Sequence, residues 1–131
     1  MVQEFIKVSH DQIIYNCDLV YLLQCNEFVK IGRTGNMIAR LQNYKSSNPM
    51  QMYIIGLISG GAKEEKALQK MFDHLWVKGE WFKYDQEIVQ YFTDFEVISL
   101  ENLQEKLIRQ QYMTNPPTGR SKLLYQKRIG L

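Results

Sequence analysis

Apolar and β-branched residues are concentrated in a few short runs. Two of them, Asp18–Gln24 and Phe28–Ile31, have only three residues between them, which is short enough for a β-hairpin. A third run, Met50–Ser59, is the most strand-like of the chain and predicts a central strand. The aromatic run Trp81–Tyr84 follows the turn pair Lys78-Gly79 and predicts a short edge strand.

Between and after these strands, the spacing of apolar residues is helical. Met37–Tyr44 carries such a pattern and is followed by Pro49, whose preceding residue disfavours the helical conformation. Ala62–Trp76 has the longest apolar stripe and predicts a helix over its whole length. Asp85–Phe92 and Leu100–Tyr112 predict two more helices. The order β-β-α-β-α-β-α-α predicts an α/β or α+β domain.

Composition narrows the class of protein. The chain has 131 residues, of which 45% are hydrophobic and 23% charged, so one globular domain is expected rather than a disordered chain. No apolar run approaches the ~20 residues of a membrane span. The first residues show neither a charged n-region nor an apolar h-region, so we expect no secretory signal. Cys17 and Cys25 lack metal-ligand spacing, which favours a reducing compartment, the cytoplasm.

Charge is distributed unevenly along the chain. Residues 1–100 carry 10 Lys and Arg against 12 Asp and Glu, whereas residues 101–131 carry 6 against 2. The basic side chains beyond the linker-like stretch Thr114–Gly119 are Arg120, Lys122, Lys127 and Arg128. Such a tail fits a polyanionic partner, and a solubilising tail is an equal alternative on charge alone.

A few polar residues stand at positions that the pattern makes unusual. Lys30 lies within a predicted strand, where an edge-strand lysine that opposes aggregation is the structural alternative. Glu64 and Glu65 flank the buried stripe of their helix, where a favourable interaction with the helix dipole is the alternative to a cation site. Arg40 borders the apolar stripe of the helix predicted over Met37–Tyr44, and the structural alternative is a solvated surface arginine. For Tyr21, the simplest role is packing within the first predicted strand.

Several short strings occur in a fixed order along the chain. They are Val20-Tyr21, Val29–Thr34 (V-K-I-G-R-T), Arg40-Leu41, Asn48-Pro49, Glu65–Leu68 with Phe72, and Gly79–Phe82 (G-E-W-F). Together they resemble the GIY-YIG nuclease superfamily, in particular its branch in phages and large DNA viruses. The resemblance covers about residues 18–90 and implies a small mixed, mainly antiparallel three-stranded sheet flanked by helices. We therefore expect a nuclease-like domain over residues 1–98, a C-terminal helix over 99–113 and a basic tail over 114–131.

The resemblance also implies an activity, metal-dependent cleavage of DNA, in the cytoplasm of the host if the protein is phage- or virus-encoded. Tyr21 matches the tyrosine of the first family tripeptide, and Lys30 replaces the tyrosine of the second. Arg40 stands at the spacing of the family's catalytic arginine, and Glu65 matches its metal-binding glutamate. At Gln69 the branch often has a histidine instead.

Phosphodiester hydrolysis gives each of these residues a role. One Mg²⁺ or Mn²⁺ on Glu65 would stabilise charge on the scissile phosphate, and Arg40 and Arg33 would bind phosphate oxygens. Tyr21 would position or deprotonate the attacking water. A free tyrosine has a pKa of about 10, so a basic Tyr21 needs a cation nearby, and Lys30 is expected across the hairpin from it.

Further expectations concern the substrate and the alternatives. Gly32 is expected to let the substrate approach the backbone closely. The tail residues Arg120, Lys122, Lys127 and Arg128, together with Arg33 and the helix after residue 99, are expected to bind DNA. The alternative is a nuclease-like fold without catalysis that binds nucleic acid or protein, and a third is a nuclease active only as a homodimer or with a partner protein. No membrane partner is expected.

Overall fold

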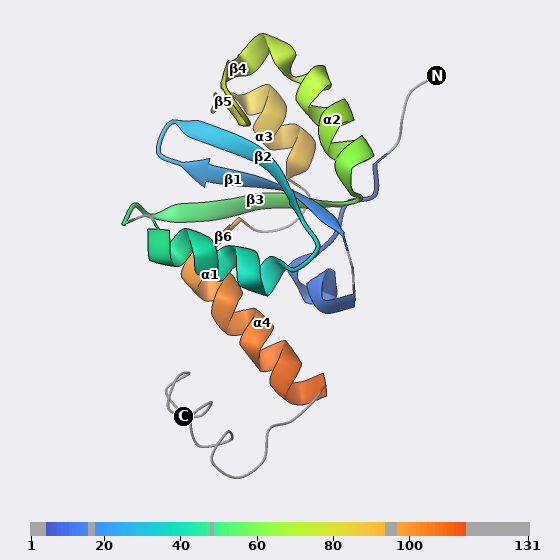
Figure 1. Ribbon diagram of the computed structural model, residues 1–131, viewed down its shortest axis with the longest axis vertical. Helices are drawn as coiled ribbons and strands as arrows, with labels where there is room; N and C mark the ends of the chain where they lie inside the picture. Colours follow the sequence, from blue (N-terminus) through green and yellow to red (C-terminus); the bar gives the residue numbers. More distant parts are fainter. Residues whose placement is uncertain (1–4, 16–17, 48, 94–96, 115–131) are drawn as a thin grey trace.

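The structure is a computed structural model that describes residues 5–15, 18–47, 49–93 and 97–114. It confirms the predicted α+β class (Figure 1). The strands are β1 (Leu19–Cys25), β2 (Phe28–Thr34), β3 (Met52–Ser59), β4 (Trp76–Lys78), β5 (Trp81–Lys83) and β6 (Ile98–Ser99). They form one antiparallel sheet in the order β4-β5-β2-β1-β3-β6. The sheet is larger than the expected three strands, because β5 and β4 extend one edge of the β2-β1-β3 centre and β6 extends the other.

Helices cover both faces of the sheet (Figure 1). They are α1 (Met37–Ser47), α2 (Ala62–Met71), α3 (Gln86–Phe92) and α4 (Leu100–Thr114), with short 3-10 helices η1 (His10–Tyr15) and η2 (Asp73–Leu75). The apolar residues of α2 and α3 pack on one face, and those of α1 and α4 pack on the other. In the described part of the chain, none of the helices has the length and apolar character needed to cross a membrane.

The first hairpin forms as predicted and decides which side chains face which layer. Cys25 pairs with Phe28, and Asn26 adopts the left-handed conformation (φ 55°) in the tight turn between them. Along β1, alternate residues then point to opposite faces. Tyr21 therefore lies on the α1/α4 face, whereas Leu22 lies on the α2/α3 face.

Polar caps fix where three of the predicted helices begin. Asn36 accepts the backbone N–H of Ala39 through Oδ1 (3.1 Å) at the start of α1. Asp85 accepts the N–H of Glu87 (2.9 Å) at the start of α3, and Ser99 Oγ accepts the N–H of Asn102 (3.2 Å) at the start of α4.

The helix predicted over Ala62–Trp76 is too long, because α2 ends at Met71. Its apolar stripe continues through Leu75, but the chain tightens there into η2, with the N–H of Leu75 donating to the carbonyl of Phe72 (2.9 Å). Trp76 then leaves the helical path and pairs with Phe82 as part of β4. For the same reason β5 is not the edge strand that the sequence predicted.

Candidate active site

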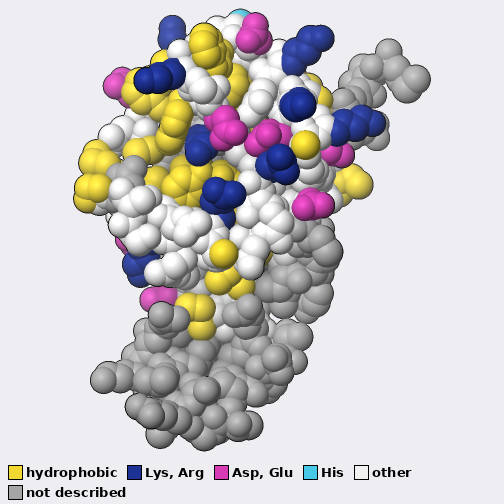
Figure 2. All heavy atoms as spheres, in the orientation of Figure 1, with side chains coloured by type: hydrophobic (Ala, Val, Ile, Leu, Met, Phe, Trp, Pro, Cys, Tyr) yellow, Lys and Arg dark blue, Asp and Glu magenta, His cyan; other side chains and the backbone are white. Residues whose placement is uncertain are grey.

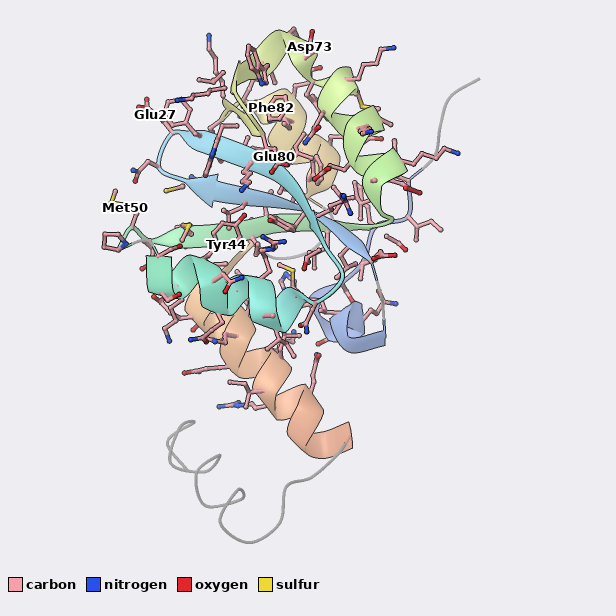
Figure 3. The ribbon with its side chains drawn as sticks, viewed as in Figure 1. Glu27, Tyr44, Met50, Asp73, Glu80 and Phe82 are labelled. Carbon is pink, nitrogen blue, oxygen red and sulfur yellow. The ribbon has the colours of Figure 1, made fainter. Side chains whose placement is uncertain are left out.

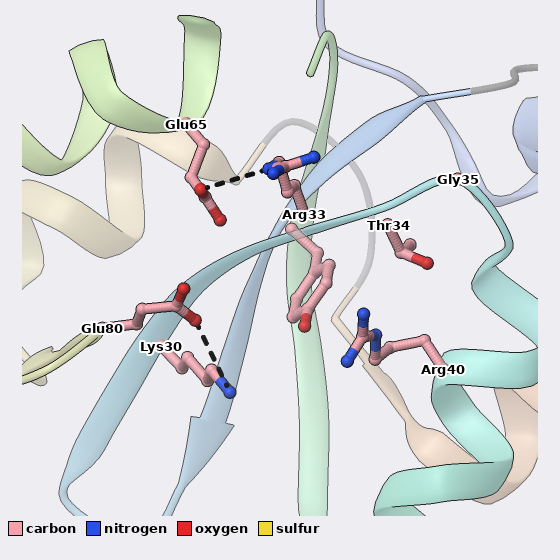
Figure 4. Close-up of a pocket in the computed structure, with 8 residues that line it drawn as sticks. Lys30, Arg33, Thr34, Gly35, Arg40, Glu65 and Glu80 are labelled. Carbon is pink, nitrogen blue, oxygen red and sulfur yellow. Dashed lines mark ion pairs between the residues drawn. The ribbon is translucent and has the colours of Figure 1, made fainter. Parts of the chain in front are cut away.

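A polar pocket opens beside the outer edge of β2. β5 pairs with β2 only from Phe28 to Lys30, so the later half of β2 has no neighbouring strand on that side. The pocket has a volume of about 310 Å³ and lies between α1 and α2 (Figure 4). Its lining consists of Tyr21, Lys30, Arg33, Thr34, Gly35, Arg40, Glu65 and Glu80. It thus brings together every site residue predicted from the first 100 residues.

The two neighbouring glutamates at the start of α2 have different roles. Glu65 is 9% exposed and faces the pocket. Glu64 turns back and accepts the backbone N–H of Gly61 (3.2 Å), so it serves as a helix cap. Burial and the negative charge of Glu80 raise the pKa of Glu65, while the positive charge of Arg33 opposes that shift.

Two arginines approach the pocket from different elements. Arg33 extends from β2, and its Nε lies 3.4 Å from Oε1 of Glu65. Arg40 extends from α1 on the opposite side of the pocket (Figure 4). The position of Arg40 depends on the turn before α1, where Thr34 Oγ1 and Asn36 exchange two hydrogen bonds of 3.0 Å.

Tyr21 crosses the face of β2 above Gly32, its partner in the strand register. A Cβ atom at Gly32 would lie 2.5 Å from the Tyr21 hydroxyl, so only glycine leaves room for the ring. This corrects the expectation that Gly32 admits the substrate to the backbone. The Tyr21 hydroxyl forms a 2.7 Å hydrogen bond with the hydroxyl of Tyr44 from α1. The two rings meet edge to face, with 6.2 Å between centroids.

The electrostatics of Tyr21 differ from the expectation of a phenolate. Burial of the ring, followed by the hydrogen bond to Tyr44, raises the pKa of Tyr21 above its usual value of 10.0. The positive charge of Arg40 opposes this shift, and Lys30 is not among its causes. In this pocket Tyr21 is therefore a protonated hydrogen-bonding group.

Lys30 is neither an edge residue nor directly opposite Tyr21. It pairs with Leu23 on one side and with Trp81 on the other, so β2 is an internal strand at this point. The interpretation of Lys30 as an edge-strand lysine is therefore wrong. Lys30 is instead a diagonal neighbour of Tyr21 on the same face, and its side chain is only 22% exposed.

Among the residues that the sequence analysis did not assign to the site, Glu80 lines the pocket and Tyr44 contacts Tyr21. Tyr44 lies between α1 and the sheet, and Glu80 lies beside β2 (Figure 3). Glu80 Oε2 is 3.6 Å from Nζ of Lys30. The G-E-W-F string was the available signal for Glu80. Tyr44 had no comparable signal, because it belongs to the apolar stripe of α1.

Gln69 has a structural role at the position where related sequences often have histidine. Its Nε2 donates to the carbonyl of Ile31 (3.1 Å) and so joins α2 to the open edge of β2. This bond holds the helix that carries Glu65 against the strand that carries Arg33.

The predicted DNA-binding tail residues, Arg120, Lys122, Lys127 and Arg128, lie outside the described residues. Within α4, Lys106 is bound to Asp11 of η1 (2.8 Å).

In the described ranges, no group of three or more His, Cys, Asp or Glu side chains is gathered that would hold a metal ion. Mg²⁺, however, often binds through one or two carboxylates and keeps several waters. Glu65, whose carboxylate faces this polar pocket, fits a cation of that kind.

Comparisons with known proteins identify one family. The profile described as the T5orf172 domain matches residues 12–97, which include every residue that lines the pocket. No curated protein and no solved structure gives a significant match.

Proposed function

The chain belongs to the T5orf172 domain family, a phage-associated domain related to nuclease-like folds, and on this premise we propose that it is a metal-dependent endonuclease of the GIY-YIG type that hydrolyses DNA. One observation carries the proposal. Tyr21, Lys30, Arg33, Arg40 and Glu65 come from four separate strings of the sequence and line one pocket.

The charge of the pocket supports a phosphodiester substrate. Three basic side chains, Lys30, Arg33 and Arg40, face two carboxylates, Glu65 and Glu80. The guanidinium groups have a planar fork that matches phosphate geometry. Arg33 is 55% exposed, so it can turn from Glu65 toward a bound phosphate without leaving a buried position.

Glu65 is the residue proposed to hold the cation, Mg²⁺ or Mn²⁺. Its carboxylate is almost fully buried at the pocket wall, where it offers the hard oxygen donors that these ions prefer. The bound ion would supply Lewis-acid stabilisation of the charge on the non-bridging phosphate oxygens. Arg40 adds a fixed positive charge from the other side of the pocket.

Tyr21 is proposed to orient the attacking water. A Tyr21 hydroxyl that donates to Tyr44 keeps an oxygen lone pair with which to accept a hydrogen bond from water in the pocket. The raised pKa of Tyr21 supports this role over that of a phenolate base. Gly32 and Tyr44 hold the ring from two sides, so the orientation is set before substrate binds.

DNA contact beyond the pocket is proposed for α2. Lys63, Lys66 and Lys70 are exposed and share one helical face by their spacing. Within the described ranges none of the three has an acidic partner at ion-pair distance. Figure 2 shows Lys and Arg side chains both over α2 and around the centre of the same face. Unpaired lysines of this kind are typical phosphate contacts.

The test of the proposed function is nicking of a supercoiled plasmid by the purified protein. We expect nicked circles with Mg²⁺ or Mn²⁺, and intact plasmid when EDTA is added. DNA binding without cleavage in either metal would favour the non-catalytic binding module instead. Sedimentation of the active species would separate a monomer from a homodimer.

A further inference from the structure

Glu80 occupies a backbone position that is fixed from two directions. Gly79, with a φ of +56°, makes the turn between β4 and β5, and its carbonyl accepts Nε1–H of Trp76 (2.8 Å). The carbonyl of Glu80 itself accepts the N–H of Ile31 on β2 (3.1 Å). The side chain therefore starts from a rigid point at the place where the pairing of β5 with β2 ends.

The carboxylate of Glu80 forms one wall of a cage around the Lys30 ammonium. Oε2 of Glu80 lies 3.6 Å from Nζ of Lys30 (Figure 4). The same nitrogen lies 5.3 Å from the ring centroid of Tyr44 and 5.9 Å from that of Trp81. Both distances are typical of cation–π contact. A lysine is a point charge on a flexible stem, so three such walls restrict where it rests.

The position of the Lys30 ammonium matters because another carboxylate faces the same pocket. Glu65 and Lys30 line the same pocket, so the charge of the ammonium acts on the carboxylate. If Glu80 no longer attracted Lys30, the nearest remaining anion of the pocket would be Glu65. A cation that must bind Glu65 would then compete with the ammonium.

We propose that Glu80 is a positioning residue, which holds Lys30 in the Tyr44/Trp81 cage and thereby keeps Glu65 open to a divalent cation. The inference rests on the proposed function only in the assignment of the cation to Glu65. Glu80 acts through Lys30 and is not itself a metal ligand. The carboxylate of Glu80 also acts directly on Glu65 through its charge. Its effect on cation binding should therefore be clearly larger with the ammonium present than without it.

A double-mutant cycle on Mn²⁺ binding tests this dependence. Glu80→Gln is expected to weaken Mn²⁺ binding in titration calorimetry by about fivefold, the scale of one charge acting at 4 Å in water. In a Lys30→Met background, Glu80→Gln should cause a clearly smaller loss, which leaves only the direct effect of its charge. The matched control is Glu87→Gln, which removes an exposed carboxylate paired with His74 at 2.8 Å and should leave Mn²⁺ binding unchanged.

A second readout needs neither metal nor DNA. The ε-methylene protons of Lys30 should be shifted upfield by the rings of Tyr44 and Trp81 and should return toward ordinary lysine values in Glu80→Gln. An unchanged Lys30 resonance in Glu80→Gln would overturn the proposal. So would an equal loss of Mn²⁺ affinity with and without Lys30, which would mean that Glu80 acts on the cation directly and not through Lys30. Wild-type protein that neither binds Mn²⁺ nor nicks DNA would refute the proposed function. In that case the Lys30 resonance would still test whether Glu80 holds Lys30 between Tyr44 and Trp81.

Discussion

The two faces of the central strands differ in the kinds of side chain that they bury. The face under α2 and α3 is apolar, and its largest buried side chains include Phe72, Phe82 and Phe92. The face under α1 and α4 has an apolar cluster of its own, yet it also includes the hydroxyl pair of Tyr21 and Tyr44 and borders Lys30. The candidate site lies at the open edge of β2, where Tyr21 and Lys30 of this second face meet Arg33 and Glu65 of the first. The first face is thus filled by apolar side chains, whereas the second combines apolar burial with the hydroxyl and ammonium groups of the site.

The largest expected effect concerns the chemistry of the polar face. Tyr21→Phe keeps the ring over Gly32 but removes the hydroxyl that orients the water, so we expect nicking to slow by roughly 10²–10³-fold, the scale of one lost preorganised hydrogen bond in an active site. Stability should fall by only about 1 kcal/mol, the value of one hydrogen bond. Single-turnover nicking and urea denaturation measure the two effects. Near wild-type cleavage by Tyr21→Phe would make this residue purely structural.

The apolar face should show the opposite behaviour. Phe72→Ala removes a ring that is 1% exposed and packed against Tyr91, with 5.4 Å between centroids, and against Phe92. The free energy of unfolding should fall by about 3–5 kcal/mol, as for other buried phenylalanines. Urea denaturation followed by circular dichroism checks this. A loss below about 1 kcal/mol would mean that this face does not carry the stability assigned to it.

A smaller effect is expected on the salt dependence of DNA binding, which distinguishes the two helices that are candidates for DNA contact. Lys66→Gln with Lys70→Gln on α2 should lower the slope of log K against log salt by about 0.9 for each phosphate that a lysine no longer neutralises. The matched pair on α4 is Lys106→Gln with Arg109→Gln, and it should change the slope less because Lys106 already binds Asp11. Duplex binding titrated with salt gives both slopes. A larger change of slope for the α4 pair than for the α2 pair would place the DNA contacts on α4 instead.

The smallest expected effect is on pH-dependent stability, far from the pocket. The ion pair with Lys106 lowers the pKa of Asp11 below its ordinary value of 3.8. Because the folded-state pKa is depressed, the pair contributes its full stabilisation at pH values above the ordinary pKa of 3.8. The contribution is lost as pH falls through the folded-state pKa. Asp11→Asn should therefore be slightly less stable than wild type at pH 6, and the difference should shrink as pH falls below 3.8 toward pH 2. Urea midpoints at the two pH values check the sign.

Most elements were predictable because their signals are local. The tight turn at Asn26 and the cap at Asp85 each act within a few residues, so the hairpin and α3 follow from the sequence. β4 did not, because Phe72 and Leu75 continue the apolar spacing of a helix. Only pairing with β5, which follows later in the chain, draws Trp76 into the sheet.

Of the site, only the residues that belong to sequence motifs were predictable. The strings of the sequence led to Tyr21, Arg40 and Glu65, and these side chains do line one pocket. Tyr44 was missed because its hydroxyl gains a role only from Tyr21, which lies 23 residues earlier. The raised pKa of Tyr21 was missed as well, because burial of its ring depends on α1 packing across the sheet.

The central claim is that the pocket containing Glu65 cleaves DNA, and adjacent glutamates provide the most direct test. Glu65 faces the pocket, whereas Glu64 caps α2, so Glu65→Gln and Glu64→Gln are matched changes in the same helical turn. Both variants are to be compared with wild type in plasmid nicking with Mn²⁺, after circular dichroism has established that each is folded. We predict that Glu65→Gln abolishes nicking and that Glu64→Gln retains it. Nicking by Glu65→Gln at the wild-type rate would contradict the assignment of this pocket as the nuclease site.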